Sequence, residues 1–261
     1  MEPTVNIALR AARKAGDIIA RASDDISRLR VEAKGKADFV TEVDLAAEEE
    51  IISSLQKTYP DHAFLCEESG RTGPEDADYL WIIDPLDGTS NFMRGIPHYC
   101  VSIACVAKGK LEHAVILDPI RQEEFTASRG RGAQLNGRRM RVSNRSELKE
   151  SLIGTGTPFL GHCDDRLDWY VKGLASIAGQ SMGIRRMGSA ALDLAYVAAG
   201  RIDGFWEAGL NAWDVAAGVL LVRESGGLVT DFKGSDAVLD GGDIMSGNPK
   251  LLRQIAGAIR A

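Results

Sequence analysis

One twelve-residue stretch, WIIDPLDGTSNF at positions 81–92, restricts the fold more than any other part of this sequence. An apolar run stops at Asp84, and Asp87 follows three residues later. The proline between them fixes its own φ and lacks an N–H, whereas Gly88 permits backbone angles that other residues avoid. The stretch therefore predicts a buried strand that ends in a rigid turn and directs two carboxylates toward one point.

Two carboxylates held so close repel each other unless a cation or a proton lies between them. A metal site is one interpretation of the pair. The other is an Asx-turn followed by a helix cap at Thr89 or Ser90, and the local features favour neither. A calcium EF-hand loop fits poorly, because its twelfth position would be Gly95 rather than a glutamate.

Two further motifs place an acidic residue where a strand ends or a helix begins. CEESG at 66–70 follows a predicted strand, and in extended chain only one of Glu67 and Glu68 can face a given side. WDVAAG at 213–218 puts Asp214 in the first turn of a helix, where the helix dipole favours a carboxylate. Each motif alone is explained without a ligand. If their carboxylates lie together, however, they form an oxygen-only cluster, which selects hard cations and above all Mg²⁺ when phosphate is the other ligand.

Histidine and cysteine give no competing metal signal. The histidines share no metal-ligand spacing, which argues against zinc; they are His62, His98, His113 and His162. The four cysteines form no CxxC pair, and Cys100 and Cys105 would point to opposite faces of a strand. We interpret them as free buried thiols in a reducing compartment.

The net charge and the distribution of apolar residues argue against binding to nucleic acid, association with a membrane and secretion. With 261 residues and a net charge of −6, the chain gives no support for electrostatic binding to nucleic acid or to an anionic membrane. The N-terminal stretch carries charges where a signal peptide needs a continuous apolar run, and no segment approaches the ~20 apolar residues of a membrane span. We expect a cytoplasmic protein.

The periodicity predicts an α/β protein whose halves differ. We expect helices at 4–22, 45–58, 165–178, 190–199 and 213–227. We expect strands at 63–66, 80–83, 99–107, 111–118, 151–156 and 203–207. The first half is predicted to be α+β and largely antiparallel, and the second a partly parallel α/β layer, which gives an N-terminal subdomain 1–147 and a C-terminal subdomain 148–261.

Helix caps and loops complete the expected layout. Asp44 is expected to cap the second helix, whose run Glu48-Glu49-Glu50 is interpreted as a solvated face, and Ser189 to cap the fourth. The polar stretch 31–44 is expected to be a mobile loop or hairpin, and 128–143 to form hairpin turns.

These motifs, taken together, resemble those of the inositol monophosphatase family. The resemblance rests on DPLDGTSNF, CEESG and WDVAAGVLLVRESGG, includes GSAALDLAYVAAGRIDGFWE, and covers nearly the whole chain. Members are Mg²⁺-dependent, lithium-sensitive phosphatases that often form dimers. The resemblance implies the layered α/β/α/β/α sugar-phosphatase fold.

The resemblance also implies two to three Mg²⁺ ions at matching positions. Glu67, Asp84 and the backbone carbonyl of Leu86 would hold one ion, and Asp84, Asp87 and Asp214 a second. A third, weaker ion would use Glu67 and mostly water.

Roles in catalysis and substrate binding follow from the same resemblance. Thr89 and Asp44 would orient the attacking water, which gives Asp44, Glu67 and Thr89 as catalytic residues. The positions expected to contact substrate are Asp87, Gly88, Thr89, Gly188, Ser189, Ala190, Glu207 and Asp214. Cys66 replaces the glycine expected before the glutamates, and either Lys34 or Lys36 would approach the site.

The expected reaction is hydrolysis of myo-inositol 1-phosphate and related inositol monophosphates by metal-activated water, without a phosphoenzyme. Histidinol phosphate, fructose 1,6-bisphosphate and 3′-phosphoadenosine 5′-phosphate are alternative substrates, because the catalytic residues handle only the common phosphate. A non-catalytic alternative is a protein that binds the transcription machinery, for which Arg185-Arg186 and the basic stretch 129–141 are candidate contacts.

Overall fold

A computed structural model describes residues 2–26, 31–35, 38–157 and 164–260, with backbone only at 31–35, 38–40 and 164. Lys36, His162 and Cys163 lie outside the described residues, and the side chain of Lys34 is not described. No helix among the described residues combines the length and the apolar character that a bilayer span requires.

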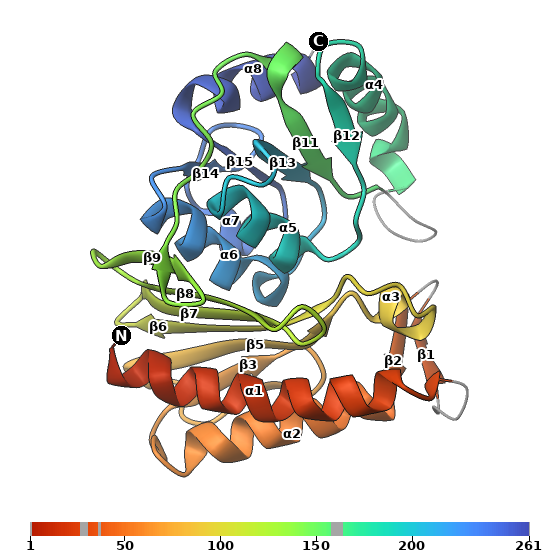
Figure 1. Cartoon of the computed structure of the whole chain (residues 1–261). Coiled ribbons are helices and arrows are strands. Elements are labelled where there is room, and N and C mark those ends of the chain that lie inside the picture. Colours follow the sequence, from red (N-terminus) through yellow and green to blue (C-terminus); the bar gives the residue numbers. More distant parts are fainter. Residues whose placement is uncertain (1, 27–30, 36–37, 158–163, 261) are drawn as a thin grey trace.

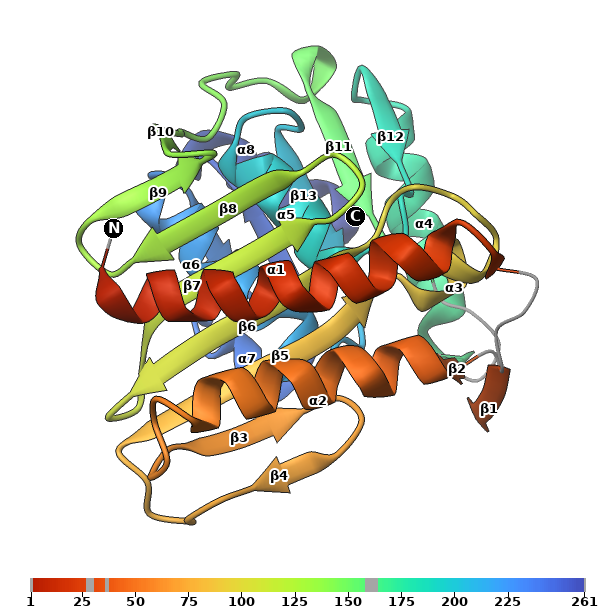
Figure 2. The same cartoon turned by 60° about the horizontal axis from the view of Figure 1, so that its bottom comes forward.

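Helices and sheets alternate in five layers (Figure 1). The outer helices α1 (Pro3–Ser23) and α2 (Glu42–Gln56) lie side by side across one face of a sheet, as Figure 2 shows. The middle layer holds α5 (Ala190–Ala198), α6 (Ala212–Glu224) and the short α7 (Val238–Gly241). The far layer holds α4 (Leu167–Ala178) and α8 (Pro249–Arg260). The α/β/α/β/α prediction is confirmed.

The first sheet has eight strands in the order β10-β9-β8-β7-β6-β5-β3-β4. They are β3 (Ala63–Cys66), β4 (Gly70–Thr72), β5 (Tyr79–Asp87), β6 (Cys100–Ala107), β7 (Lys110–Asp118), β8 (Glu123–Ser128), β9 (Gly132–Leu135) and β10 (Arg138–Arg139). Every pair is antiparallel except β3 with β5, which agrees with the expectation for this half. A separate hairpin joins β1 (Val31–Gly35) and β2 (Asp38–Thr41), within the stretch expected to be a loop or hairpin.

The second sheet has five strands in the order β12-β11-β13-β15-β14. They are β11 (Leu152–Thr155), β12 (Gly183–Arg185), β13 (Gly204–Glu207), β14 (Leu228–Thr230) and β15 (Ile244–Gly247). The first three are parallel to one another and the last two antiparallel, as expected of a partly parallel layer. Short helices within the described residues include α3 (Thr89–Met93), η2 (Leu148–Glu150) and η3 (Asp164–Arg166).

The alternation of side chains along β6 divides the core into two layers. Cys100 and Ala104 pack toward α5 and α6, whereas Val101, Ile103 and Cys105 pack toward α1 and α2. Cys100 and Cys105 therefore point to opposite faces, as predicted from their spacing. Because the α5–α6 layer packs on both sheets, the division at residue 147 remains a proposal.

The start of α2 differs from the prediction. The helix begins at Glu42 with Thr41 as its N-cap, and Asp44 is the third residue of its first turn. The Thr41 hydroxyl accepts from the Val43 N–H, and Asp44 accepts from the Thr41 N–H in return. The sequence TEVD matches this reciprocal capping pattern. Asp44 therefore takes part in capping as predicted, but as the third residue of the helix and not as its N-cap.

His62 lies in an aromatic stack at the edge of the first sheet. Its ring stacks between Tyr59 and Tyr79, with centroids 4.6 and 4.5 Å away. The indole N–H of Trp81, a fully buried residue, donates to His62 Nδ1 at 3.0 Å. The bond requires a neutral Nδ1, and burial lowers the pKa of His62 from its ordinary 6.5.

Replacing His62 with phenylalanine should keep the stack but leave the Trp81 N–H without its acceptor, at a cost of about 1–3 kcal/mol at pH 7.5. Because the folded pKa is lowered, the wild-type contribution is present above pH 6.5 and is lost as pH falls through the folded pKa. Urea unfolding at pH 7.5 and pH 5 should show a smaller pH dependence in His62→Phe. Equal pH dependence in both proteins would contradict the assignment.

Candidate active site

The Asp84–Asp87 turn is a β-bulge at the end of β5. Asp84 pairs with Ser102 and Asp87 with Cys100, so three steps along β5 match two along β6. In a regular strand, residues three apart face opposite sides, and the additional residue lets both carboxylates face the same side. The Leu86 N–H donates to Asp84 Oδ1 at 3.0 Å and holds the turn.

Glu67 is brought beside Asp84 by the parallel pairing of β3 and β5. Cys66 lies opposite Ile83, and the Glu67 N–H continues the ladder by donating to the Ile83 carbonyl at 3.1 Å. The Glu67 side chain forms a hydrogen bond with Asp84, which raises the Asp84 pKa. Two carboxylates can bond in this way only by sharing a proton, and a cation can take the place of that proton.

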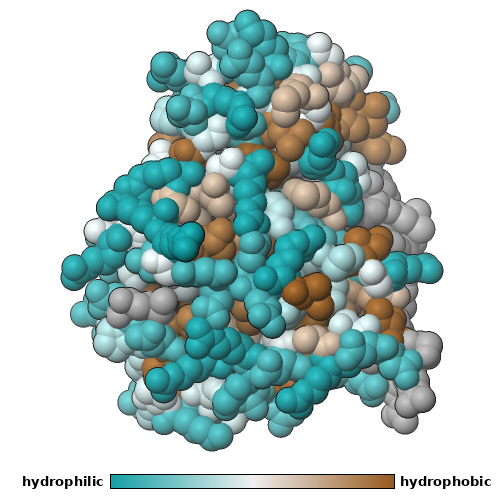
Figure 3. Space-filling view, viewed as in Figure 1, coloured by the Kyte–Doolittle hydropathy of each residue, from teal (hydrophilic) through white to brown (hydrophobic). Residues whose placement is uncertain are grey.

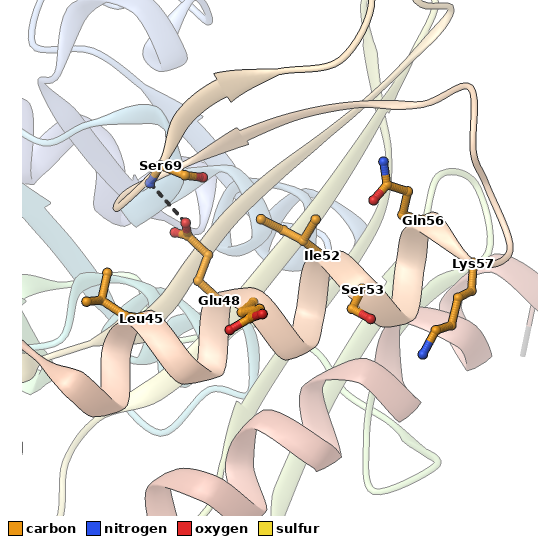
Figure 4. Close-up of a pocket in the computed structure, with 8 residues that line it drawn as sticks. Leu45, Glu48, Ile52, Ser53, Gln56, Lys57 and Ser69 are labelled. Atoms are coloured by element: carbon orange, nitrogen blue, oxygen red, sulfur yellow. Dashed lines mark hydrogen bonds between the residues drawn. The ribbon is translucent and has the colours of Figure 1, made fainter.

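Glu48 holds the turn that carries Glu67, and the prediction of a solvated face is wrong for it. Only 4% of Glu48 is exposed, and its two carboxylate oxygens accept the N–H groups of Glu68 and Ser69, both at 2.9 Å. Figure 4 shows Glu48 reaching from α2 to Ser69. A cavity of about 590 Å³ lies along this face of α2, and its lining includes none of the predicted site residues.

Asp214 approaches the same carboxylates from α6. Its Oδ2 accepts the N–H of Asn211, the N-cap, at 2.6 Å, so the side chain is fixed at the start of the helix. The predicted place in the first helical turn is correct. Burial and the charge of Asp87 raise the pKa of Asp214, and Glu67 raises it further.

Together, the first sheet and α6 gather four mutually repelling carboxylates, those of Glu67, Asp84, Asp87 and Asp214. Burial, then Glu67, Asp87 and Asp214 raise the pKa of Asp84 well above its ordinary range. Within the described residues no three His, Cys, Asp or Glu side chains lie at a spacing that could hold a metal ion. The all-oxygen donor set fits a hard divalent cation such as Mg²⁺, whose charge would offset the mutual repulsion of these carboxylates.

Thr89 and Asp44 form a short polar relay next to this cluster. Thr89 Oγ1 lies 3.0 Å from Asp44 Oδ1 and 3.0 Å from the Leu86 carbonyl oxygen. The other Asp44 oxygen accepts from Thr41, through both its N–H and its hydroxyl. Burial raises the pKa of Asp44, although these donors oppose the change.

Asp87 is held by the start of α5, across the boundary between the two sheets. Its Oδ2 accepts from the Ser189 hydroxyl at 2.6 Å and from the Ala191 N–H at 2.7 Å. Ser189 occupies the predicted N-cap position, but its side chain makes no capping bond because the hydroxyl donates to Asp87. Only 1% of Ser189 is exposed.

Glu207, at the end of β13, faces the carboxylate cluster from the second sheet. A Cβ added to Gly156 would lie 1.6 Å from Glu207 Oε1, so this glutamate occupies space that only glycine leaves open. Burial and the charge of Asp193 raise the pKa of Glu207 to about 8, while Arg186 lowers it. Burial therefore favours the protonated carboxyl group, which can both donate and accept hydrogen bonds.

The structure thus brings the predicted residues to one region where α3, α5 and α6 begin. Sequence reasoning missed Thr41 and Glu48, which fix Asp44 and the Glu67 turn. It also missed Asn91, whose amide joins the two halves. Only Thr41 left a local signal, the capping pattern TEVD, because the partners of the other two are distant in sequence.

Comparison with known proteins gives matches over the full chain. A family model described as the inositol monophosphatase family matches residues 1–261. Nus factor SuhB of Pseudomonas aeruginosa is 57% identical, covering 100% of this chain and 97% of that protein. The crystal structure of extragenic suppressor protein suhB from Bartonella henselae has a TM-score of 0.96 at 44% identity, covering 99% of each chain. Inositol monophosphatase from Anabaena (Nostoc) has a TM-score of 0.84 at 35% identity, covering 98% of this chain and 94% of that one.

Proposed function

Because the chain belongs to the inositol monophosphatase family, whose members are generally Mg²⁺-dependent, we propose that it hydrolyses myo-inositol 1-phosphate and related inositol monophosphates. The observation that carries this proposal is the cluster of Glu67, Asp84, Asp87 and Asp214 with the neutral carboxyl of Glu207 beside it. The cluster suits cations that receive a phosphate dianion, and Glu207 suits a neutral polyol.

The side chains have separable tasks in this proposal. Glu67, Asp84, Asp87, Asp214 and the Leu86 carbonyl would hold Mg²⁺. When bound, Mg²⁺ would supply positive charge to the phosphate and make a water more acidic. Thr89 would orient that water for in-line attack, with Asp44 accepting the Thr89 proton. The N–H groups of Gly88 and Thr89 would donate to phosphate oxygens. Because the water attacks the phosphate directly, no phosphoenzyme is required.

Glu207 favours an inositol over histidinol phosphate. A carboxyl with a pKa of about 8 is neutral at pH 7 and offers both donor and acceptor to hydroxyl groups. An ammonium group instead favours the ionised carboxylate, which burial opposes here. The Ser189 hydroxyl is bonded to Asp87, so we assign the contact of Ser189 with inositol to its backbone N–H.

The Michaelis constant for inositol 1-phosphate should rise above pH 8, as Glu207 loses its proton and adds negative charge beside the substrate. The folded pKa is raised, so the stability linked to Glu207 is fully present below pH 4.5 and is lost as pH passes about 8. Glu207→Gln keeps a neutral donor and acceptor, and its Michaelis constant should rise less between pH 7 and pH 9. An identical rise in the two proteins would contradict this role.

A substrate panel tests the activity itself. Phosphate release would be measured with inositol 1-phosphate, histidinol phosphate, fructose 1,6-bisphosphate and 3′-phosphoadenosine 5′-phosphate, with Mg²⁺ and with EDTA. We expect preference for inositol 1-phosphate and loss of all release in EDTA. Preference for another ester would move the substrate and keep the chemistry, whereas no release from folded protein with Mg²⁺ would overturn the enzyme proposal.

A second candidate function is binding to the transcription machinery. It is favoured by the name of a 57% identical relative, Nus factor SuhB of Pseudomonas aeruginosa. Arg185-Arg186 and the basic stretch 129–141 remain the candidate contacts; the arginines of that stretch are exposed. Such contacts need no catalysis and no direct binding to nucleic acid.

The two functions are separated by one variant. Co-sedimentation with a purified transcription elongation complex of Pseudomonas aeruginosa should be unchanged in Asp87→Asn if binding is non-catalytic. Loss of binding in an otherwise folded Asp87→Asn protein would tie the contact to the active site. No co-sedimentation of the wild type would reject this second function.

We also infer a homodimer from exposed apolar side chains. Leu167 and Val171 on α4 and Met182, just before the edge strand β12, are 46%, 52% and 61% exposed. In Figure 3 apolar atoms gather around the position of α4, and such patches mark interaction sites. Light scattering should give twice the chain mass of 28.1 kDa, and Val171→Asp should lower it to the monomer.

A further inference from the structure

The amide of Asn91 connects two backbone segments that are far apart in sequence. Asn91, on α3, is 8% exposed. Its Nδ2 donates to the His98 carbonyl at 2.8 Å and to the Met187 carbonyl at 2.8 Å. The two amide hydrogens thus match two carbonyls, one on each side of the boundary between the sheets.

The backbones that meet beside Asn91 have little free space. Gly88 and Gly188 have φ of 100° and 91°, a region that favours glycine. A Cβ on Gly88 would lie 3.3 Å from the Gly188 carbonyl oxygen, and a Cβ on Gly188 would lie 3.1 Å from Asn91 Nδ2. The turn at Gly188 therefore packs against the turn at Gly88, and the Asn91 amide lies beside this contact.

These two turns serve different parts of the substrate in the proposed function. Gly88 and Thr89 are on the phosphate side, whereas Gly188 leads into Ser189 and Ala190 on the polyol side. A second contact, from Asp87 to Ser189, joins the same segments but also belongs to the metal cluster. Asn91 is not among the predicted metal ligands or substrate contacts, and so its effect on position can be tested separately.

We propose that Asn91 is a positioning residue that holds the Met187–Gly188 turn against Gly88 and so sets the distance between the phosphate side and the polyol side of the site. This inference rests on the proposed function. Its consequence is selective: an ester that presents only its phosphate does not depend on Asn91, whereas an inositol phosphate that spans both turns does.

The test compares Asn91→Ala with wild type on inositol 1-phosphate and on p-nitrophenyl phosphate, both with Mg²⁺. We expect kcat/KM for inositol 1-phosphate to fall by about tenfold or more, mainly through KM, because a substrate contact is misplaced. For p-nitrophenyl phosphate the change should stay within about threefold. An equal loss on both substrates would overturn the proposal.

Asn248→Ala is the matched control. Asn248 is 9% exposed, and its Nδ2 donates in the same way to the carbonyls of Ser143 and Arg145. We expect this variant to lose stability without any difference between the two substrates. A substrate-dependent loss in Asn248→Ala as well would show that the effect is general destabilisation, and would contradict a specific role for Asn91.

Hydrogen exchange gives a readout that does not depend on activity. In Asn91→Ala, the backbone amides at 187–190 should exchange faster than in wild type, whereas in Asn248→Ala they should not. If wild type releases no phosphate from inositol 1-phosphate, the proposed function fails, and exchange still decides whether Asn91 holds the turn. Unchanged exchange at 187–190 in Asn91→Ala would refute the positioning role.

Discussion

Replacing Asp84 with asparagine should lower Mg²⁺-dependent phosphate release by about 10²–10³-fold or more. The substitution removes a proposed carboxylate ligand of Mg²⁺, and with it positive charge that would stabilise the reacting phosphate. Asp84 is 2% exposed, and its Oδ1 accepts the Leu86 N–H. Asparagine can keep this bond through its own Oδ1, so the bulge should persist. The change therefore removes a negative charge and leaves the backbone in position.

The same substitution should make the metal-free protein more stable, by about 0.5–2 kcal/mol. Burial and the charges of Glu67, Asp87 and Asp214 all raise the pKa of Asp84, so its ionised form opposes folding. Urea unfolding in EDTA should give the higher midpoint for Asp84→Asn. In excess Mg²⁺ the wild type should gain more than the variant, because a ligand that binds only the folded state stabilises it.

Asp118→Asn is the control for both measurements. Asp118 is 1% exposed, like Asp84, but accepts the N–H groups of Ile120 and Arg121 and pairs with the Arg121 guanidinium at 2.9 Å. Its loss should lower stability equally with and without Mg²⁺. If Asp84→Asn were the less stable protein in EDTA, or gained as much from Mg²⁺ as wild type does, the carboxylates would not be a cation site.

The amino-acid sequence predicts those parts of the site whose geometry is local. Pro85 and Gly88 made a rigid turn at Asp84 and Asp87 predictable. In the structure this turn is formed by a β-bulge between the two aspartates. Most long elements were also predictable, because buried side chains follow the period of each helix and strand. The order of the layers followed from the family resemblance. The place of Asp214 in the first turn of a helix was predicted from the sequence, whereas its proposed role as a metal ligand rests on the family resemblance.

Residues whose role depends on a distant partner could not be predicted in this way. Glu48 lies in a run of three glutamates that is most simply solvated, and only the fold brings the amides of Glu68 and Ser69 to it. Asn91 looks like an ordinary helix residue until the Met187 carbonyl, 96 positions away, is placed against it. A charge or amide in sequence therefore shows which bonds it can make, and the topology decides which bonds it does make.

Replacing Thr89 with valine should lower kcat by about 10²–10³-fold, the usual range for a residue that transfers or orients a proton. Thr89 Oγ1 has two acceptors at 3.0 Å, Asp44 Oδ1 and the Leu86 carbonyl, but a hydroxyl has only one hydrogen. The charged acceptor is the stronger one, so the hydroxyl donates to Asp44 and keeps its lone pairs for a water. Valine has nearly the same shape as threonine and removes only the hydroxyl, with its hydrogen bonds to Asp44 and to the water.

Thr89→Ser retains the hydroxyl and should keep kcat within about fivefold of wild type, whereas KM should change little in either variant. Asp44 itself is fixed independently, since its other oxygen is bonded by Thr41. Loss of the Thr89 hydroxyl should therefore leave the carboxylate in place without its link to the attacking water. If Thr89→Val instead kept kcat within about fivefold of wild type, the hydroxyl would not be needed and the relay through Asp44 would be wrong.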